Sequence, residues 1–279
     1  MSWGSHIAFA AVATALSLAT SAIPNRAVAQ AVADQLSSDA KAILAAAFAN
    51  RYEVDLTSKV LLVMRDNHGQ QRRREFQAAY KLIEGRMHSI GRLIWPHHLR
   101  GMTILTIEAD NRGHDAFIYL PSLGKVRRVS IAQRGDSFFG SDVTYEDLER
   151  RRVDEYDLES VEDGESHGEL VHVISGRSLR EFSYARIVFV VSQADSAILE
   201  TQHFKREQAE PFRVITARRD DMVREDGHVL PTRVTVYNRM RGTSTQVTFE
   251  DLRINPVIDD HLFSAARLER DRDLPIDRH

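Results

Sequence analysis

Ser166 and Ser38 are the first residues to test for chemistry, because each lies in a spacing that enzymes use for nucleophilic catalysis. Ser166 is the centre of GESHG (164–168), which matches G-x-S-x-G. A nucleophile elbow needs a buried strand before this motif and a helix after it, but acidic LESVED precedes it and strand-like ELVHVIS follows it. SDAK (38–41) matches S-x-x-K, yet S-D-N and K-T-G do not follow it. We therefore interpret Ser166 as a hairpin-tip residue and Ser38 as a helix cap, and we expect no enzyme.

Metal and thiol chemistry receive little support from the sequence. The chain has no cysteine, which excludes disulfides, thiolate metal sites and a cysteine nucleophile. Its twelve histidines form no H-E-x-x-H motif. His97 and His98 are adjacent and should point in different directions, and His114 lies beside Asp115 at a predicted turn. We predict no metal and no cofactor.

The balance of charge argues against nucleic acid as a partner. Charged residues make up 28% of the chain and the net charge is −3. No basic stripe is interleaved with aromatic residues, which is the pattern that nucleic-acid binding would favour.

Three arginines are harder to dismiss. Arg72 and Arg74 share one face of a predicted strand with Phe76, and Arg127 lies on another strand in KVRRVS. One interpretation is a solvated face. The other is the rim of a cavity, where an arginine would pair with the loop aspartates Asp136 and Asp142.

The N-terminus is typical of an export signal. Residues 7–20 are apolar and uncharged, within the ~7–15 residues of a signal core and short of the ~20 that span a bilayer. AVA at 27–29 offers a cleavage site before Gln30. We predict a signal peptide over 1–29 and one domain over 30–279, located in the periplasm without a lipid anchor. A wrongly assigned start or a buried helix is the alternative, and an intact Met1 on a cytoplasmic protein would contradict export.

Beyond the N-terminus the patterning predicts one helix followed by many strands. Ser37 or Ser38 could cap a helix that buries Ala40, Leu44 and Phe48 and stops near Asn50. From residue 54 the period becomes two, NHG at 67–69 predicts a hairpin turn, and about a dozen short strands follow without intervening helices. This favours a mainly β protein with one antiparallel sheet. Thr144 and Asp147 predict a capping box at the start of a short helical interruption, YEDLERR.

FIYLPSLGKVRRVS and RGDSFFGSDVTYEDLERR, between Phe117 and Arg152, resemble the outer-membrane lipoprotein-sorting family of LolA-like carriers. The similarity is to the longer branch, whose members often accompany large export pumps. It implies a curved, incompletely closed antiparallel barrel, with a leading helix and a loop with a short helix as a lid over an acyl-chain cavity. Shorter members hold the lid with a cavity arginine, which we cannot assign to one position from the sequence.

The resemblance gives the paired rings of Phe138 and Phe139 a role as an apolar lid, with Gly135 and Gly140 freeing the backbone at its edges. We expect the ligand site to include Leu56, Leu62, Met64, Phe76, Phe138, Phe139 and Tyr145. The expected partners are acyl chains of a lipid or lipoprotein, with an inner-membrane export pump or an outer-membrane acceptor and only transient membrane contact. The predicted function is a periplasmic carrier, or chaperone, that delivers acyl chains. Alternatives are a lipoprotein-sensing regulatory module of the same fold and, third, a lipid hydrolase.

Overall fold

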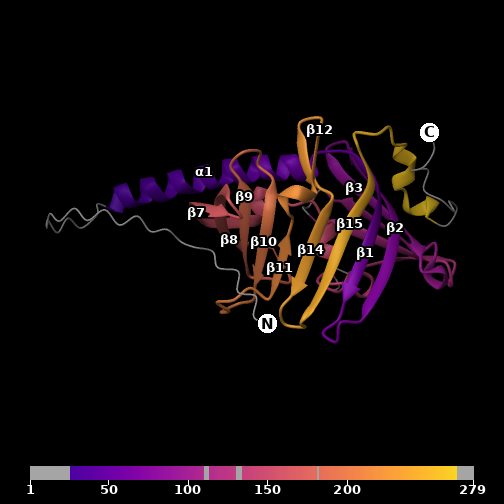
Figure 1. Cartoon of the computed structure of the whole chain (residues 1–279). Coiled ribbons are helices and arrows are strands. Elements are labelled where there is room, and N and C mark those ends of the chain that lie inside the picture. Colours follow the sequence, from indigo (N-terminus) through magenta and orange to yellow (C-terminus); the bar gives the residue numbers. More distant parts are fainter. Residues whose placement is uncertain (1–25, 110–112, 130–133, 181, 269–279) are drawn as a thin grey trace.

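The computed structural model of the chain describes residues 26–109, 113–129, 134–180 and 182–268, with side chains from residue 35 onward (Figure 1). The predicted signal segment therefore falls almost entirely outside the described residues, and its cleavage stays a prediction. No helix in the described part of the chain has both the length and the apolarity needed to cross a membrane.

The helix α1 (Arg26–Tyr52) is longer than the sequence predicts. Ser37 and Ser38 lie inside it, so their prediction as an N-cap is wrong: alanine-rich residues on both sides continue the helix past them. The predicted buried face is confirmed, since Ala40, Leu44 and Phe48 are buried. At the C-terminal end, the side chain of Asn50 accepts a hydrogen bond from the backbone N–H of Val229 at 2.7 Å. This bond fixes the end of the helix to a neighbouring hairpin.

The rest of the chain is mainly β, as predicted, and the described strands form one thirteen-stranded antiparallel sheet and one two-stranded sheet. The large sheet has the order β6-β5-β4-β3-β2-β1-β15-β14-β11-β10-β9-β8-β7, so its two end strands do not pair with each other and the barrel stays open. Its strands are β1 (Leu56–Arg65), β2 (Gln71–Ile83), β3 (Arg86–Trp95), β4 (Thr103–Glu108), β5 (His114–Leu120), β6 (Lys125–Arg128), β7 (Tyr156–Ser166), β8 (Glu169–Ser178), β9 (Arg186–Ser192), β10 (Ile198–Phe204), β11 (Arg213–Thr216), β14 (Arg233–Asn238) and β15 (Thr243–Ile254), while β12 (Met222–Glu225) pairs with β13 (His228–Pro231).

The first and last strands along the chain, β1 and β15, pair with each other in the middle of the sheet. β1 lies between β2 and β15, with Leu62 opposite Arg74 on one side and Val247 on the other. The predicted turn at 67–69 is confirmed: the carboxylate of Asp66 accepts from the backbone N–H groups of His68 and Gln70, both at 2.9 Å. Sequence-distant strands thus meet in the middle of the molecule.

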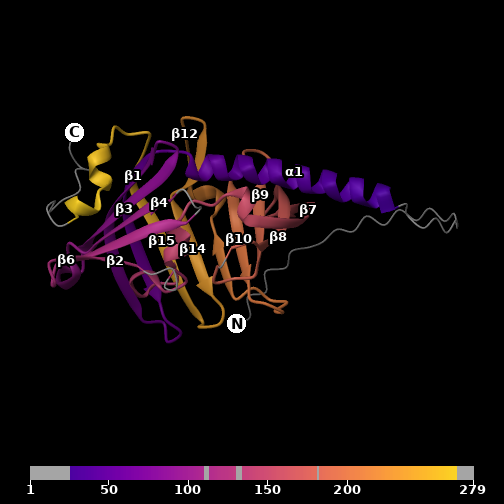
Figure 2. The ribbon, with the colours of Figure 1, turned by 180° about the vertical axis from the view of Figure 1, so that it is seen from behind.

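Two layers cover the sheet on different sides. α1 lies along the β7–β10 part in both views (Figure 1, Figure 2), where its buried face packs on Tyr156, Ile174 and Phe189. At the other end, Ile258, Leu262 and Phe263 of the C-terminal segment pack with Ile90 and Leu105. This segment contains the short turns η7 (Asp260–Phe263) and η8 (Ala265–Arg267).

The hairpin-tip prediction for Ser166 is confirmed. Ser166 ends β7 and pairs with Glu169, and His167 and Gly168 form the two-residue turn with φ of 52° and 80°. Two positive φ values in a two-residue hairpin are typical of a type I′ turn. Since a strand and not a helix follows, the nucleophile elbow has no structural basis here.

Candidate functional site

An apolar cavity of about 250 Å³ lies inside the curved sheet. Its walls come from both halves: β1, β2 and β3 on one side, and β9, β10, β14 and β15 on the other. Tyr52 and Val54 close it where α1 meets the sheet, and Phe138, Val143 and Leu148 close it from the loop between β6 and β7. Its volume is close to the lower end of the roughly 300–1,000 Å³ of ligand pockets. The cavity can therefore take a slender apolar ligand.

Four of the predicted ligand residues line this cavity: Leu56, Leu62, Phe76 and Phe138. The other three, Met64, Phe139 and Tyr145, are not among its lining residues. Met64 is buried beyond the cavity on β1.

Phe139 and Tyr145 support the lining from behind. Their rings pack edge-on against Phe138, with centroid distances of 4.7 and 5.7 Å. Phe76 contacts both phenylalanines at 5.3 Å. Aromatic contacts of this kind stabilise beyond their buried area, so the four rings form one cluster at the cavity wall.

The cavity loop, residues 134–155, is built from three short turns: η3 (Phe138–Gly140), η4 (Tyr145–Leu148) and η5 (Val153–Glu155). The predicted capping box is confirmed, because the backbone N–H of Thr144 donates to the Asp147 carboxylate at 2.8 Å. The helical interruption, however, is a series of 3-10 turns and not one helix.

The two glycines of the loop serve different purposes. Gly140 has φ of +77°, as the predicted backbone freedom requires. Gly135 does not have a positive φ; a β-carbon on it would lie 3.0 Å from the β-carbon of Ser183. Gly135 therefore permits close approach between the loop and the segment before β9, and the prediction that it supplies conformational freedom is wrong.

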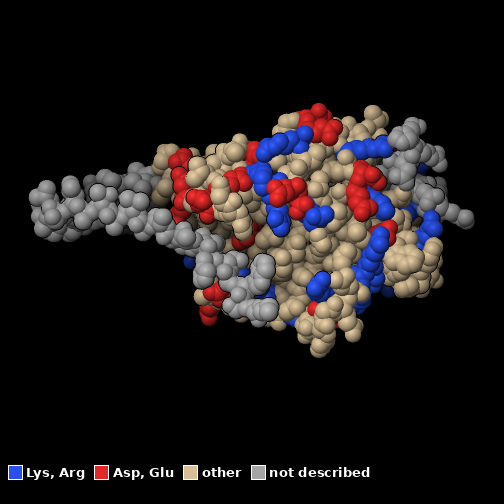
Figure 3. Space-filling view, viewed as in Figure 1, with Lys and Arg blue, Asp and Glu red and all other residues tan. Residues whose placement is uncertain are grey.

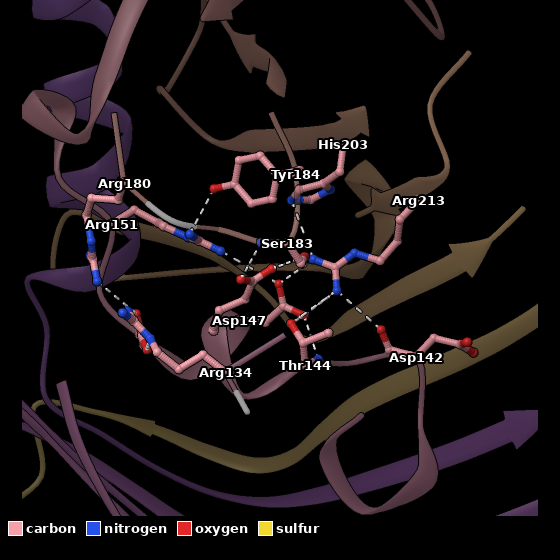
Figure 4. A network of polar contacts seen from close by, with 12 residues as sticks. Arg134, Asp142, Thr144, Asp147, Arg151, Arg180, Ser183, Tyr184, His203 and Arg213 are labelled. Carbon is pink, nitrogen blue, oxygen red and sulfur yellow. Dashed lines mark hydrogen bonds and ion pairs between the residues drawn. The ribbon is translucent and has the colours of Figure 1, made fainter. Parts of the chain in front are cut away.

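Arg213 on β11 fastens the cavity loop from inside (Figure 4). Its Nη1 donates to Asp147 at 2.7 Å and its Nη2 donates to the other carboxylate oxygen at 2.6 Å. Nη1 also lies 3.3 Å from the carbonyl oxygen of Asp142 and from Oγ1 of Thr144. Arg213 is fully buried and Asp147 lines the cavity. Burial alone would raise the pKa of Asp147, but the charge and hydrogen bonds of Arg213 outweigh it and hold that pKa well below its ordinary value.

A second buried arginine joins the same carboxylate to an aromatic layer. Arg151 lies 3.8 Å from Asp147, donates to the hydroxyl of Tyr184 at 2.9 Å and stacks over Phe182. The hydroxyl of Tyr184 is 3.0 Å from that of Tyr156. Burial raises the pKa of Tyr156 to about 12, so both phenols stay neutral and act as hydrogen-bonding groups.

His203 completes the buried cluster as a neutral ring. It lies edge-on to Tyr184 with a centroid distance of 4.7 Å, and its Nε2 is 3.5 Å from Nη2 of Arg213. Burial first, and then the charge of Arg213, keep its pKa well below the ordinary value. A neutral imidazole beside a guanidinium adds no like charge to the site.

Two further carboxylates anchor the ends of the cavity loop. Glu149 accepts a hydrogen bond from Nε of Arg134 at 2.5 Å, and His114 Nδ1 lies 3.3 Å away. Burial opposes ionisation of Glu149, but His114 and Arg134 lower its pKa to about 2. Glu108 on β4 accepts from Arg152 at 2.7 Å. These contacts connect the loop to β4 and β5, two neighbouring strands near one end of the sheet.

The predicted rim residues lie elsewhere. Arg72 and Arg127 are exposed, Arg74 is half-buried and donates to the carbonyl oxygen of Arg73, and Asp136 is exposed. Asp142 is buried and accepts from the hydroxyls of Thr243 and Thr245 at 2.5 and 2.9 Å. Among the described residues, none of the three arginines pairs with these aspartates, so the structure separates groups that the sequence suggested together.

The sequence does carry a signal for Arg213, although a weak one. In FRVITAR, the alternation of a strand places Arg213 on the same face as Ile215 and Ala217. Both of these line the cavity. An arginine on the apolar face of a strand needs a buried anion. The partner, Asp147, lies 66 residues earlier, and no local pattern connects the two.

The described residues contain no group of His, Cys, Asp and Glu that could hold a metal ion. Because the cavity walls are mainly apolar and Asp147, the carboxylate that lines the cavity, is held by Arg213, the arrangement serves binding better than proton transfer. The site can bury the apolar surface of a ligand next to the cavity loop.

Comparison with known proteins shows the family and the fold. Residues 86–270 match a family model described as "-like: Uncharacterized protein". The chain belongs to this family. No curated protein matches it. The resemblance to LolA-like proteins is confirmed at the level of the fold by solved structures.

Three of these structures share the fold at low sequence identity. A domain from Vibrio parahaemolyticus, named for outer membrane lipoprotein sorting, is 19% identical over 84% of this chain and 100% of its own, with a TM-score of 0.77. A DUF1329 family protein from Desulfovibrio piger is 20% identical over 85% of this chain and 98% of its own, with a TM-score of 0.73. A LolA superfamily protein from Nitrosomonas europaea is 18% identical over 81% and 98%, with a TM-score of 0.64. At these identities the similarity shows that the chain shares its overall fold with the three proteins.

Proposed function

We propose that this LolA-like protein is a periplasmic carrier, not an enzyme, which binds acyl chains of a lipid or lipoprotein in its cavity and delivers them to an outer-membrane acceptor or a transporter. The observation that carries the proposal is the apolar cavity walled on one side by a loop that the Arg213–Asp147 ion pair attaches to β11. The names of two similar structures, for lipoprotein sorting and for the LolA superfamily, point the same way.

The energetics suit transfer better than storage. Each buried methylene contributes roughly 0.8 kcal/mol, so one long acyl chain contributes on the order of 10 kcal/mol. A bilayer offers a similar gain, and a carrier must therefore match it without exceeding it. Met87 in the cavity wall is flexible and unbranched, which lets the wall adapt to different chains.

In the proposed cycle the cavity loop is the lid. Phe138 forms part of the wall, and Phe139 lies half-buried behind it. Movement of the loop away from β11 would expose both rings and the cavity together. The Arg213–Asp147 pair then sets how readily the loop opens, because both charges must find water or other partners when it moves.

The direct test measures how tightly a fluorescent fatty-acid probe binds to the double variant Phe138→Ala, Phe139→Ala. We expect weaker probe binding with a modest change in the urea midpoint, since Phe138 already borders a cavity and its truncation enlarges existing space. Phe117→Ala is the matched control, because Phe117 packs in the cluster covered by the C-terminal segment. It should leave probe binding unchanged.

Two results would reject the proposal: unchanged probe binding in the double variant, or a wild-type protein that binds no probe at all. Mass spectrometry of lipid that co-purifies with the native protein would identify the cargo. Delivery is tested separately by mixing the loaded protein with acceptor membranes, where a carrier releases its lipid and a sensor retains it.

A further inference from the structure

Positive charge is concentrated in four connections of the large sheet, which we call the basic edge: residues 65–74, 95–102, 121–128 and 237–244. These segments contain ten Lys and Arg residues and one acidic residue, a net charge of +9 in a chain whose total is −3. The remainder of the chain therefore carries −12. The basic residues are Arg65, Arg72, Arg73, Arg74, Arg100, Lys125, Arg127, Arg128, Arg239 and Arg241.

The four segments lie at one end of the barrel because antiparallel neighbours turn at the same edge. Arg65, the last residue of β1, is opposite Gln71 of β2 and Ser244 of β15. Leu120 and Lys125 pair across the turn between β5 and β6.

Neighbouring turns also touch one another. A β-carbon on Gly242 would lie 3.5 Å from that of Asn67, and one on Gly101 would lie 3.3 Å from Cγ of Pro121. Figure 1 shows the turns of β1–β2 and β14–β15 projecting together at the lower end of the molecule. Glu75, which follows Arg74 on β2, is opposite Trp95 of β3 and joins the two pairs of turns, so the basic edge is one continuous surface.

Most of this charge has no internal partner. Arg73, Arg128 and Arg239 pair with acidic side chains. Within the described part of the chain, no acidic side chain pairs with Arg65, Arg72, Arg100, Lys125, Arg127 or Arg241, and all six are exposed. Figure 3 shows acidic side chains instead at the upper tip of the β12–β13 hairpin.

The basic edge also exposes large apolar side chains. Trp95 is 43% exposed, Leu123 is 49% exposed and Met240 is 67% exposed. Each comes from a different connection. Arginine and lysine around exposed tryptophan and aliphatic residues form the combination that favours the interface of an anionic bilayer.

The cavity loop borders this same edge. Asp142 of the loop accepts from Thr243, the first residue of β15 after the turn, and Phe139 contacts Phe76 on β2. A surface pressed against the basic edge would therefore meet the part of the loop that carries Phe138 and Phe139.

We propose that the basic edge docks on the surface of a membrane containing anionic lipid, with Trp95, Leu123 and Met240 entering the headgroup region. Docking in this orientation brings the wall of the cavity formed by the cavity loop next to the bilayer. This goes beyond acyl-chain binding, which the fatty-acid probe tests without any membrane. An acidic protein surface is the competing partner, but it gives no reason for three exposed apolar side chains on three separate turns.

The experiment is co-sedimentation of the full chain with phosphatidylcholine vesicles and with mixed phosphatidylcholine–phosphatidylglycerol vesicles. We expect binding to the mixed vesicles and little to the neutral ones. Raising the salt from about 0.1 M to about 1 M should weaken it, since the screening length falls from ~10 to ~3 Å. Arg65→Gln, Lys125→Gln, Arg127→Gln and Arg241→Gln together should reduce the affinity at least tenfold, because each basic residue near an anionic surface adds to the binding free energy.

The matched control removes the same charge elsewhere: Lys41→Gln, Arg177→Gln, Arg218→Gln and Arg253→Gln, all at exposed positions outside the basic edge. It should bind mixed vesicles as the wild type does. In a Trp3→Phe background, brominated lipid should quench the remaining tryptophan, Trp95.

Equal loss in both quadruple variants, equal binding to both vesicle types, or no vesicle binding would each overturn the proposal. Absence of quenching by brominated lipid would overturn the insertion of Trp95. Fatty-acid probe binding in the basic-edge variant should stay at the wild-type value, so failure of docking and failure of the proposed carrier function are distinguishable.

Discussion

Arg213 and Asp147 form a buried ion pair with two hydrogen bonds, 2.7 and 2.6 Å long, between a strand of the sheet and the cavity loop. Asp147 has a second use, because its Oδ2 also accepts from the backbone N–H and the hydroxyl of Thr144 at 2.8 Å. One carboxylate therefore shapes the turn η4 and attaches it to β11. Local folding of the loop and its fastening to the wall are coupled through this residue.

The first prediction concerns this pair. Arg213→Met leaves the Asp147 carboxylate buried without its main counter-charge, and we expect it to lower the free energy of unfolding by about 3–5 kcal/mol in urea titration. Arg213→Met combined with Asp147→Leu should recover only part of that loss, because both charges of the pair are gone but Arg151 and the turn at Thr144 also lose the carboxylate. Arg218→Met, at an exposed position, is the control and should stay within about 0.5 kcal/mol of the wild type. A single Arg213→Met variant as stable as the wild type would contradict the role of the pair.

How much of this could be predicted from the sequence depends on the range of the interactions. Period-two alternation placed Leu62 and Phe76 on an inner face, and both line the cavity. The capping box of Thr144 and Asp147 spans three residues, and its pattern predicts it correctly. These are local consequences of strand geometry and turn chemistry.

The tertiary contacts were not predictable in the same way. Arg213 and Asp147 are 66 residues apart, and Asp142 meets Thr245 across 103 residues. Such pairs depend on sheet order, and the pairing of β1 with β15 has no local signal. The strand alternation of Arg72 and Arg127 allowed a place at the cavity rim, next to the loop aspartates. In the structure both side chains are exposed at the basic edge instead.

The second prediction is a specific acid sensitivity. Glu149 has a folded-state pKa of about 2 against an ordinary value of 4.5. Because the folded value is the lower one, its contribution is complete above about pH 5 and is lost as the pH falls toward 2. The difference corresponds to about 3 kcal/mol at neutral pH. Glu149→Gln should therefore lower the thermal midpoint at pH 7 and make the midpoint fall less steeply between pH 5 and about 2.

The matched comparison for acid sensitivity is Glu207→Gln, at an exposed carboxylate in the connection between β10 and β11. Its pH profile should overlay that of the wild type. Parallel profiles for Glu149→Gln and the wild type would show that the buried carboxylate does not contribute.

The third prediction separates a carrier from a hydrolase. Ser166 is at the tip of the β7–β8 hairpin, two residues from Gly168, and it does not line the cavity. Ser166→Ala should leave fatty-acid probe binding and any cellular activity unchanged. Loss of activity in a normally folded Ser166→Ala protein, measured with an ester substrate, would favour hydrolysis over carriage.

The last prediction tests the cavity itself through its smallest wall residue. Gly91 on β3 lines the cavity, and a β-carbon there would lie 3.5 Å from Cγ2 of Ile104, which is ordinary contact. Gly91→Ala should therefore fold and bind the fatty-acid probe as the wild type does. Gly91→Leu places a branched side chain in a space of about 250 Å³ and should weaken binding at least tenfold, or ~1.4 kcal/mol. Overpacking costs roughly 1–3 kcal/mol in a filled core, but less beside open space, so urea unfolding of the lipid-free protein should change little. If Gly91→Leu folds normally and binds as tightly as Gly91→Ala, the acyl chain lies somewhere other than this cavity.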